Sequence, residues 1–498
     1  MIRMRVSSLK SKTVNAIKWS YFSMFTSLSL QLFFAAILSR LLTKEQFGIW
    51  ATASLLQRFG QFIADLGIGQ AIVQKSSLSQ DDIRAGLTSS MALGLVATAL
   101  AWLAAPFAAE FFKNPDVAPV FRGYACVYVL YGANTLSASL LRRALRFKPL
   151  VTAELSSYIL GHGLLGLGAA YLGYGAQSLV ISAVAQGLIQ LVILYSATRH
   201  TLRPIFRVSA YQGLYTFGMR ATVINFLEFI SASLDTFLIA KFYSKAALGT
   251  YSRTFSTLAM PATNFAMSLS RVLAPSFSAV QDEPERLRRA YLSGLRAMAL
   301  VIFSAAGCII IDAPEIVKVM LGPQYLDSIT LMQTFALFIP FAVLTNLSAV
   351  LAEATARLNV KIAIQAVYFV ALATAFWTTY RLGGQVEQIA IVLVAASMVR
   401  SVAYAFVARQ IIGGSGREIA LSYGLGGLYF VGSALLTAAV VFTLRAINVP
   451  LPLLFVTELL LGAAVLAGVV LLGPPSELQQ MARTSLQQLR GRLAGTPG

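Results

Sequence analysis

Two stretches of this chain decide how its fold is organised: residues 42–52, LTKEQFGIWAT, and residues 243–253, YSKAALGTYSR. A shift of 201 residues aligns them, so that Gly48 falls on Gly249 and an aromatic residue follows two places later in both. Each stretch joins the first two apolar segments of a six-segment set. Because six is an even number, both sets enter a membrane from the same side, which indicates a parallel repeat. The alignment therefore predicts two six-helix lobes facing a central cavity, with two further helices after the repeat.

The apolar segments around these stretches are typical of an all-α membrane protein. Of the 498 residues, 57% are hydrophobic and only 12% are charged, whereas soluble domains carry about 25% charged residues. The apolar runs are long enough to cross a hydrocarbon core of about 30 Å as helices. We predict fourteen transmembrane helices, at approximately residues 15–41, 47–74, 86–110, 118–140, 150–172, 176–198, 211–242, 247–275, 288–312, 327–354, 360–380, 386–410, 418–445 and 451–472.

The distribution of positive charge predicts the orientation of these helices. With the N-terminus in the cytoplasm, 23 of the 39 Lys and Arg residues fall in cytoplasmic segments and 6 in outer segments. Basic residues favour the cytoplasmic side, so we expect both termini there. Most of the net charge of +19 then faces the inner leaflet, and no nucleic-acid partner is expected. The predicted parts are the N-lobe 1–205, the C-lobe 206–412, helices thirteen and fourteen in 413–472, and the cytoplasmic tail 473–498.

Catalytic and metal-binding functions find little support in the sequence. Cys126 and Cys308 both lie in apolar stretches, so a disulfide framework is not expected, and no group has metal-ligand spacing. Every predicted loop is short, whereas a membrane glycosyltransferase or polymerase needs a large catalytic loop. We therefore expect no catalytic residue, metal or cofactor.

Arginines inside apolar stretches are the strongest indication of function. A charged side chain near the bilayer centre costs roughly 2.5–3.5 kcal/mol on insertion scales, so its retention indicates a water-filled interior that binds an anion. Arginine suits phosphate because its planar guanidinium makes paired, charge-assisted hydrogen bonds. Lys18 and Arg271 extend the set toward the cytoplasmic side. The four arginines deepest in apolar stretches are Arg58, Arg220, Arg253 and Arg400.

The eighth predicted helix arranges part of this set as a polar stripe. Arg253, Asn264 and Arg271 fall within about 20° of one another around the helix and extend over about 27 Å along it. Pro261 lies between them, and we expect it to interrupt the helix and act as a hinge. An alternative for Arg271 is that its side chain only reaches the cytoplasmic headgroups.

Acidic residues in the predicted helices are candidates for coupling to an H⁺ or Na⁺ gradient. Arg58, Gln61 and Asp65 share one face of the second helix. Glu228 and Asp235 lie seven residues apart in the seventh helix. The alternative is that these acids form structural ion pairs, with Arg58 and Asp65 neutralising each other.

Several short motifs, in order along the chain, resemble those of polysaccharide exporters and lipid-linked oligosaccharide flippases of the MOP (multidrug/oligosaccharidyl-lipid/polysaccharide) superfamily. The resemblance covers roughly residues 10–410 and is nearest to the colanic-acid-exporter branch. The motifs are KTVNAIKWS at 12–20, QFG at 46–48, DLGIGQAIVQK at 65–75, NPDVAP at 114–119, RVLAPSF at 271–277, then Gln281-Asp282, Leu287-Arg288 and Tyr291.

This resemblance implies fourteen helices, two lobes and alternating access in a bacterial inner membrane. The implied cargo is an undecaprenyl-pyrophosphate-linked oligosaccharide repeat unit, moved from the cytoplasmic to the periplasmic leaflet for exopolysaccharide, capsule or lipopolysaccharide synthesis. A polysaccharide polymerase and a chain-length regulator are the implied protein partners. Alternatives within the superfamily are a lipid II flippase and a multidrug or organic-cation antiporter, although the cavity of a cation antiporter should be acidic.

Overall fold

The computed structural model describes residues 2–75, 77–207, 211, 226, 228–414 and 416–472. All regular structure in these ranges is helical, which confirms the predicted all-α class. By contacts, the chain divides into two compact units, Met1–Arg253 and Thr254–Gly498. The boundary falls inside one long helix, so the lobes 1–205 and 206–412 drawn from the sequence repeat stay a prediction.

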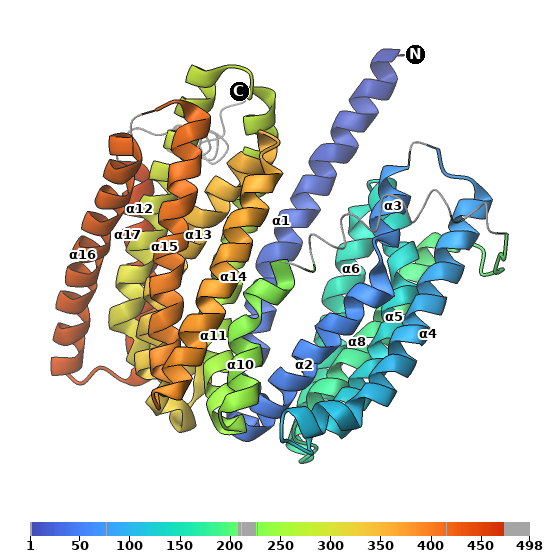
Figure 1. Cartoon of the computed structure of the whole chain (residues 1–498), viewed down its shortest axis with the longest axis horizontal. Helices are drawn as coiled ribbons and strands as arrows, with labels where there is room; N and C mark the ends of the chain where they lie inside the picture. The colour runs from blue at the N-terminus through green and yellow to red at the C-terminus, as the bar shows by residue number, and fades with distance from the viewer. Residues whose placement is uncertain are drawn as a thin grey trace, which may run out of the picture. The chain divides into compact units, whose positions relative to one another are not determined.

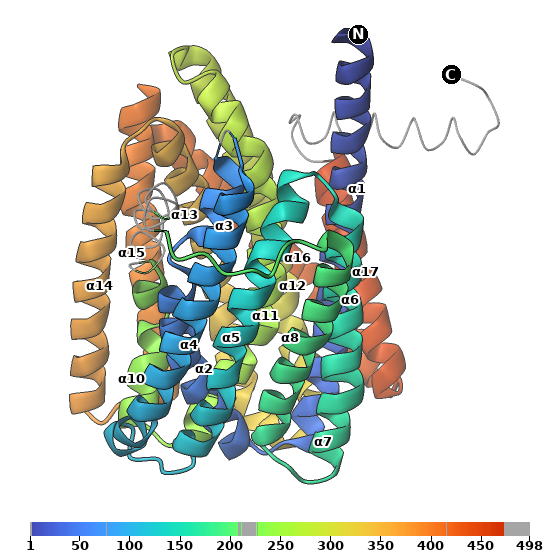
Figure 2. The same ribbon diagram turned by 90° about the vertical axis from the view of Figure 1, so that its right-hand side faces the viewer.

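In the first unit, α5 is the central helix and packs against α2, α4 and α8 (Figures 1 and 2). The core between these helices combines small side chains such as Ala101 and Ala125 with the fully buried Tyr128. Small residues allow the close helix approach that membrane bundles use. The elements of this unit are α1 (Ile2–Leu41), α2 (Lys44–Asp65), α3 (Ile68–Gln74), α4 (Gln80–Phe111), α5 (Val117–Arg143), α6 (Phe147–Tyr158), the π-helix η1 (Ile159–Gly166), α7 (Leu167–Tyr171), α8 (Gln177–Thr198), α10 (Leu234–Phe242) and the start of α11 (Lys245–Ala279).

In the second unit, α12 is the central helix and packs against α13, α16 and α17 (Figure 1). α15 packs against α13 and α14. α16 and α17, which the sequence repeat leaves outside, are therefore attached through α12. The elements of this unit are α12 (Pro284–Ile316), η3 (Val317–Leu321), η4 (Pro323–Ser328), α13 (Ile329–Ala354), α14 (Leu358–Arg381), α15 (Val386–Ile412), α16 (Gly416–Ala446) and α17 (Leu451–Leu472).

Ten helices in the described ranges are long and apolar enough to cross a membrane. This confirms a polytopic membrane protein, while the count of fourteen spans stays a prediction. α2, α5 and α11 lie at predicted spans and are long enough to cross a membrane, but they are not among these ten apolar helices. Each of them carries charged or polar residues within its apolar stretch, such as Arg58, Arg122 and Arg253.

Two predicted helices differ in the structure from a single regular α-helix. The helix expected at 47–74 ends at Asp65, because Leu66 and Gly67 adopt left-handed conformations with φ of 37° and 71°. Left-handed residues end helices, and glycine does so without a Cβ clash. The helix expected at 150–172 contains a π-helical segment, Ile159–Gly166.

The expected interruption at Pro261 is wrong, because α11 continues through it from Lys245 to Ala279. Membrane helices tolerate proline when neighbouring groups satisfy the backbone carbonyl that it leaves free.

The two repeated stretches begin their helices with the same cap. The Thr43 hydroxyl accepts a hydrogen bond from the Gln46 amide at 3.3 Å, and the Ser244 hydroxyl accepts one from the Ala247 amide at 3.1 Å. Both pairs are related by the 201-residue shift. Each satisfies a backbone amide that the first turn of a helix leaves unpaired. In the first turn of α2, hydrogen bonding to its own backbone amide also lowers the pKa of Glu45.

The glycines of the repeat lie in reciprocal contact where α2 and α11 begin. A Cβ built on Gly48 would lie 1.8 Å from the Lys245 carbonyl oxygen, and one built on Gly249 would lie 1.8 Å from the Lys44 carbonyl oxygen. Lys44 and Lys245 are themselves related by the same shift. The two helix starts therefore pack about a local twofold axis, which supports the duplication inferred from the sequence.

Candidate functional site

Arg400 lies on α15 with its guanidinium stacked on Tyr368 of α14. The Cζ atom is 4.2 Å from the centre of the Tyr368 ring, and Tyr368 is only 9% exposed. The buried Nε of Arg400 has no hydrogen-bond partner in the part of the chain that the structure describes. Cation–π attraction holds the guanidinium without using its N–H donors. Arg400 is therefore well prepared to take up an anionic group.

Arg58 and Asp65 of α2 do not form the ion pair that was the structural alternative. Arg58 is exposed and has no hydrogen-bond or ion-pair partner among the described residues. Asp65 is half-buried at the C-terminal end of α2, and the positive charge that acts on it comes from Arg142 of α5. Arg58 thus keeps its donors free for an anion, while an ion-coupling role for Asp65 stays a prediction.

Arg253 is buried, with 8% exposure, and is bound to the end of α1. Its Nε donates to the Ser39 hydroxyl at 2.6 Å, and an Nη donates to the Ala35 carbonyl. Its Cζ lies 5.0 Å from the centre of the Phe47 ring. These contacts give Arg253 a structural role between α1 and α11, and its predicted role in substrate binding stays a prediction.

Asp235 is also held by its own structure. Its carboxylate accepts a hydrogen bond from the Tyr251 hydroxyl at 2.7 Å and another from the Thr236 amide at 2.6 Å. Asp235 lies in the first turn of α10, where an anion interacts favourably with the helix dipole. These hydrogen bonds give Asp235 a structural role, with neutral donors in place of the ion pair expected as the alternative. Glu228 is half-buried before the start of α10 and is not without a partner. Coupling roles for Glu228 and Asp235 stay predictions.

The remaining candidates are not brought together by contacts of their own. Asn264 is half-buried and donates to the Met260 carbonyl at 2.9 Å on α11. Arg271, further along the same helix, is exposed, and so is Lys18 on α1. Arg220 lies outside the described residues, as does the tail from residue 473 onward.

The sequence analysis missed Arg122 of α5, which resembles Arg400 in its surroundings. Its Cζ lies 5.4 Å from the centre of the Trp102 ring of α4. Its buried Nε lacks a partner among the described residues. The sequence feature that could have identified Arg122 is its position as an arginine within the apolar segment predicted at 118–140.

A second missed group is acidic and joins α12, α16 and α17. Glu315 of α12 accepts two hydrogen bonds from Arg445 of α16, at 3.2 and 2.6 Å. Asp312 and Glu458 are 7% and 3% exposed, with carboxyl oxygens that lack partners in the described chain. Glu458 is the single ionisable residue of the apolar α17, which was the signal in the sequence.

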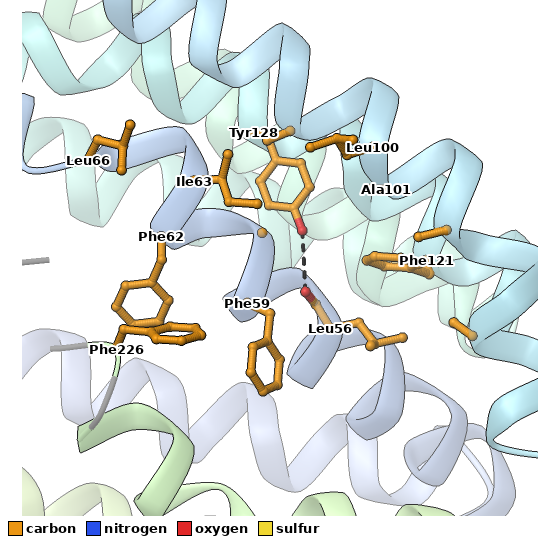
Figure 3. A pocket seen from close by; sticks show the side chains of 14 residues that line it. Leu56, Phe59, Phe62, Ile63, Leu66, Leu100, Ala101, Phe121, Tyr128 and Phe226 are labelled. Carbon is orange, nitrogen blue, oxygen red and sulfur yellow. Dashed lines mark hydrogen bonds between the residues drawn. The ribbon is translucent and has the colours of Figure 1, made fainter. Parts of the chain in front are cut away.

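The first unit contains an apolar pocket of about 510 Å³ between α2, α4 and α5. Phe59, Phe62 and Phe226 form an aromatic group at one side of it, and Phe62 and Phe226 lie with ring centres 5.3 Å apart (Figure 3). Tyr128 brings the single polar side-chain atom of the lining, and its hydroxyl donates to the Gln57 carbonyl at 2.8 Å. The pocket therefore suits a hydrocarbon chain and not an ionic group.

Comparison with protein families decides which group of membrane proteins this is. Residues 37–330, more than half of the chain, match the model of a family described as polysaccharide biosynthesis protein. The chain belongs to this polysaccharide biosynthesis family. The resemblance drawn from the short motifs is thereby confirmed. The match includes Arg58 and Arg253, whereas Arg400 and Glu458 lie beyond its end.

Two proteins whose names refer to polysaccharide synthesis are similar to this chain at low identity. The chain is 21% identical over 328 residues to lipopolysaccharide biosynthesis protein WzxC of Escherichia coli, a match covering 66% of each chain. It is 24% identical over 299 residues to succinoglycan biosynthesis transport protein ExoT of Rhizobium meliloti, covering 59% of this chain and 60% of ExoT. The chain thus spans less than two thirds of the length of each relative, 66% of WzxC and 60% of ExoT.

The fold of this polysaccharide biosynthesis family member is similar to that of a solved lipid II flippase, MurJ, in an inward closed conformation. The TM-score is 0.68 with 12% sequence identity, and the alignment covers 91% of this chain and 97% of MurJ. At this identity the likeness establishes the fold alone.

Proposed function

We propose that this protein is a flippase for a lipid-linked oligosaccharide. It carries an undecaprenyl-pyrophosphate-linked repeat unit from the cytoplasmic to the periplasmic leaflet by alternating access, and so supplies exopolysaccharide, capsule or lipopolysaccharide synthesis. The observation that carries this proposal is the match of residues 37–330 to the polysaccharide biosynthesis family.

The chemistry of the site supports an amphipathic anionic cargo. A pyrophosphate crossing about 30 Å of hydrocarbon must stay paired or hydrated. Arg400 and Arg58 present guanidinium groups with unused donors in the described chain, and guanidinium binds phosphate through paired hydrogen bonds. The apolar pocket beside Phe59 and Phe62 suits a hydrocarbon chain. In this proposal each unit presents an arginine that can bind the anionic head of the cargo, Arg58 in the first and Arg400 in the second. The pocket of the first unit binds part of a lipid chain.

The place of the protein in the cell is part of the same proposal. We place it in the bacterial inner membrane with both termini in the cytoplasm, as the bias of basic residues indicates. The glycan lipid and the bilayer are its partners, and a polymerase and a chain-length regulator would act on the delivered repeat unit. H⁺ or Na⁺ coupling would supply the driving force.

Reconstitution tests this function directly. Proteoliposomes that contain the purified chain and a fluorescent undecaprenyl-pyrophosphate oligosaccharide are treated with a membrane-impermeant oxidant of sugars. We expect oxidation to approach completion with the protein present and to stop at the outer-leaflet fraction in empty liposomes. Equal protection in both preparations would overturn the proposal.

Two further cargoes separate the alternatives in the same vesicles. Transport of lipid II in place of the oligosaccharide lipid would assign the protein to peptidoglycan synthesis. Uptake of a cationic dye in place of either lipid would identify a drug antiporter.

A further inference from the structure

α16 and α17 have no assigned role, and a charged cavity opens where they meet α12. The cavity has a volume of about 410 Å³ and is lined by Glu315, Lys318, Arg445 and Leu454, among other residues. It lies beside the connection between α16 and α17. In the predicted orientation this connection faces the periplasm, so the cavity offers periplasmic water a path toward α12 and α17.

Glu458 lies one helical turn deeper than the cavity wall. It follows Leu454 by four residues on α17, and residues four apart share one face of a helix. Glu458 is 3% exposed, and both of its carboxyl oxygens are buried without a partner in the described chain. A carboxylate without hydrogen bonds or a counter-ion is very costly to bury, whereas a neutral carboxylic acid is much less so.

Asp312 of α12 stands in a similar position. It precedes Glu315 by one helical turn and is 7% exposed, with a buried Oδ1 that lacks a partner in the described residues. Asp312 and Glu315 both act electrostatically on Glu458. Arg445 cannot neutralise all three acids, because its guanidinium is already bound by both oxygens of Glu315.

The charged and titratable groups that act on Asp312 and Glu458 come from α12, η3, α16 and α17. They are Cys308, Asp312 and Glu315 on α12, Lys318 on η3, Arg445 on α16, and Glu458 on α17. Three carboxyl groups thus stand against two cations.

A proton fits this arrangement better than a metal ion. Hard cations bind through six or so oxygen ligands. Pro314 leaves the Ile310 carbonyl of α12 without its helical donor, and this carbonyl accepts a hydrogen bond from Gln333 Nε2 at 3.1 Å. No three His, Cys, Asp or Glu side chains in the described part of the chain are grouped in a way that could hold a metal ion. A proton needs one carboxyl oxygen, and two acids that interact electrostatically take up protons as a pair.

We propose that Glu458 and Asp312 form a proton-binding pair, reached from the periplasm through the cavity at Glu315 and Arg445. The inference rests on the proposed flippase function and names the coupling ion. Proton uptake would neutralise the acids between α12 and α17, and proton release would charge them. In the flippase, the inward proton gradient would act on α12 through this pair.

Carbodiimide labelling tests the proton site apart from transport. Dicyclohexylcarbodiimide adds to protonated carboxyl groups in apolar surroundings, and mass spectrometry of the purified full chain locates the adduct. We expect labelling of Glu458 that falls as pH rises, and loss of that adduct in Glu458→Gln. Asp312→Asn should keep the adduct on Glu458 and change its pH dependence. The control Glu110→Gln, an exposed acid at the end of α4, should label as the unaltered protein does. No adduct on Glu458 at any pH would overturn the proposal.

Transport in the reconstituted vesicles tests the coupling. An inward proton gradient should stimulate transport by the unaltered protein and by Glu110→Gln, and this stimulation should be absent in Glu458→Gln. Thermal unfolding checks that the Glu458→Gln protein is folded. Transport driven by a Na⁺ gradient and indifferent to pH would overturn the proton pair and leave the flippase function standing. Failure of the unaltered protein to transport under any gradient would overturn the function, while the labelling would still decide the proton site.

Discussion

At the scale of single residues, Arg400 is the arginine whose loss should weaken substrate binding. Its guanidinium stacks on Tyr368 and keeps its donors unused in the described chain. Hydrogen bonds to charged groups contribute about 1.5–3 kcal/mol each, so Arg400→Ala should lower affinity for the pyrophosphate-linked lipid by roughly ten- to a hundredfold. Arg400→Lys should recover only part of it, because lysine lacks the paired donors.

Affinity measured by thermophoresis in detergent checks this expectation. Arg381→Ala is a matched control, because Arg381 also lies over an aromatic ring, Trp377 at 5.7 Å, but is exposed at the end of α14. Unchanged affinity in Arg400→Ala would remove Arg400 from the binding site.

Arg253 should behave in the opposite way, as a residue of stability. Arg253→Ala removes the bonds to Ser39 and Ala35, and each hydrogen bond from a charged group contributes about 1.5–3 kcal/mol. We expect a lower temperature of unfolding without any substrate present. Ser39→Ala should also destabilise, because it leaves a buried guanidinium nitrogen without that partner. Arg271→Ala, an exposed residue on the same helix, should unfold close to the unaltered temperature. Full stability of Arg253→Ala combined with lost transport would restore its predicted role in binding.

The contrast between Arg253 and Arg400 shows that the sequence predicts which residues are charged inside apolar runs, but not the contacts that those residues make. Arg253 and Arg400 were selected for the same reason, a charge inside an apolar run, and one is bound by α1 while the other is not. Partners distant in the chain decide this difference. The acidic pair could not be predicted for the same reason. Asp312 and Glu458 belong to separate helices, and only the packing of α12 on α17 brings them together.

At the scale of helices, the glycines at the starts of α2 and α11 should not tolerate a side chain. A Cβ at Gly48 or Gly249 would meet a backbone carbonyl of the opposite helix at 1.8 Å, and no rotamer change moves a carbonyl. Overpacking costs about 1–3 kcal/mol, so Gly48→Ala and Gly249→Ala should each lower the temperature of unfolding. Gly432→Ala on α16, where a Cβ has open space, should leave it unchanged or raised.

The double variant provides a sharper test of the same contact. Because the glycines share one contact, moving the helices apart for one Cβ makes room for the other, and neighbouring substitutions are not additive. The loss in Gly48→Ala/Gly249→Ala should therefore be smaller than the sum of the single losses. Strict additivity would mean that the glycines act separately.

Helix positions were predictable because the length and hydropathy of the apolar runs determine them. The shared caps at Thr43 and Ser244 agree with the sequence repeat. The breaks inside helices were not predicted. Leu66 ends α2 in a left-handed conformation that the hydropathy pattern does not predict. The π-helix η1 contains His162 in an otherwise apolar run without proline. Pro261 shows the converse, since a residue expected to break α11 does not.

At the scale of the whole molecule, the orientation in the membrane is the property on which the proposed direction of transport depends. The bias of basic residues predicts that the connection between α3 and α4 lies in the cytoplasm and the connection between α7 and α8 in the periplasm. Ser77 and Tyr174 are exposed residues in these two connections. Each can be changed to cysteine in a chain whose own Cys126 and Cys308 have been replaced by serine.

Labelling of these cysteines in whole spheroplasts with a membrane-impermeant maleimide tests the orientation. Tyr174→Cys should react in intact spheroplasts, and Ser77→Cys should react only after the membrane is opened with detergent. The cysteine-free chain provides the background, and transport by it shows that the replacements are tolerated. The reverse pattern would place the cavity at Arg445 and Glu315 on the cytoplasmic side. Protons would then reach Glu458 from the cytoplasm, and the inward proton gradient would no longer drive export through this pair.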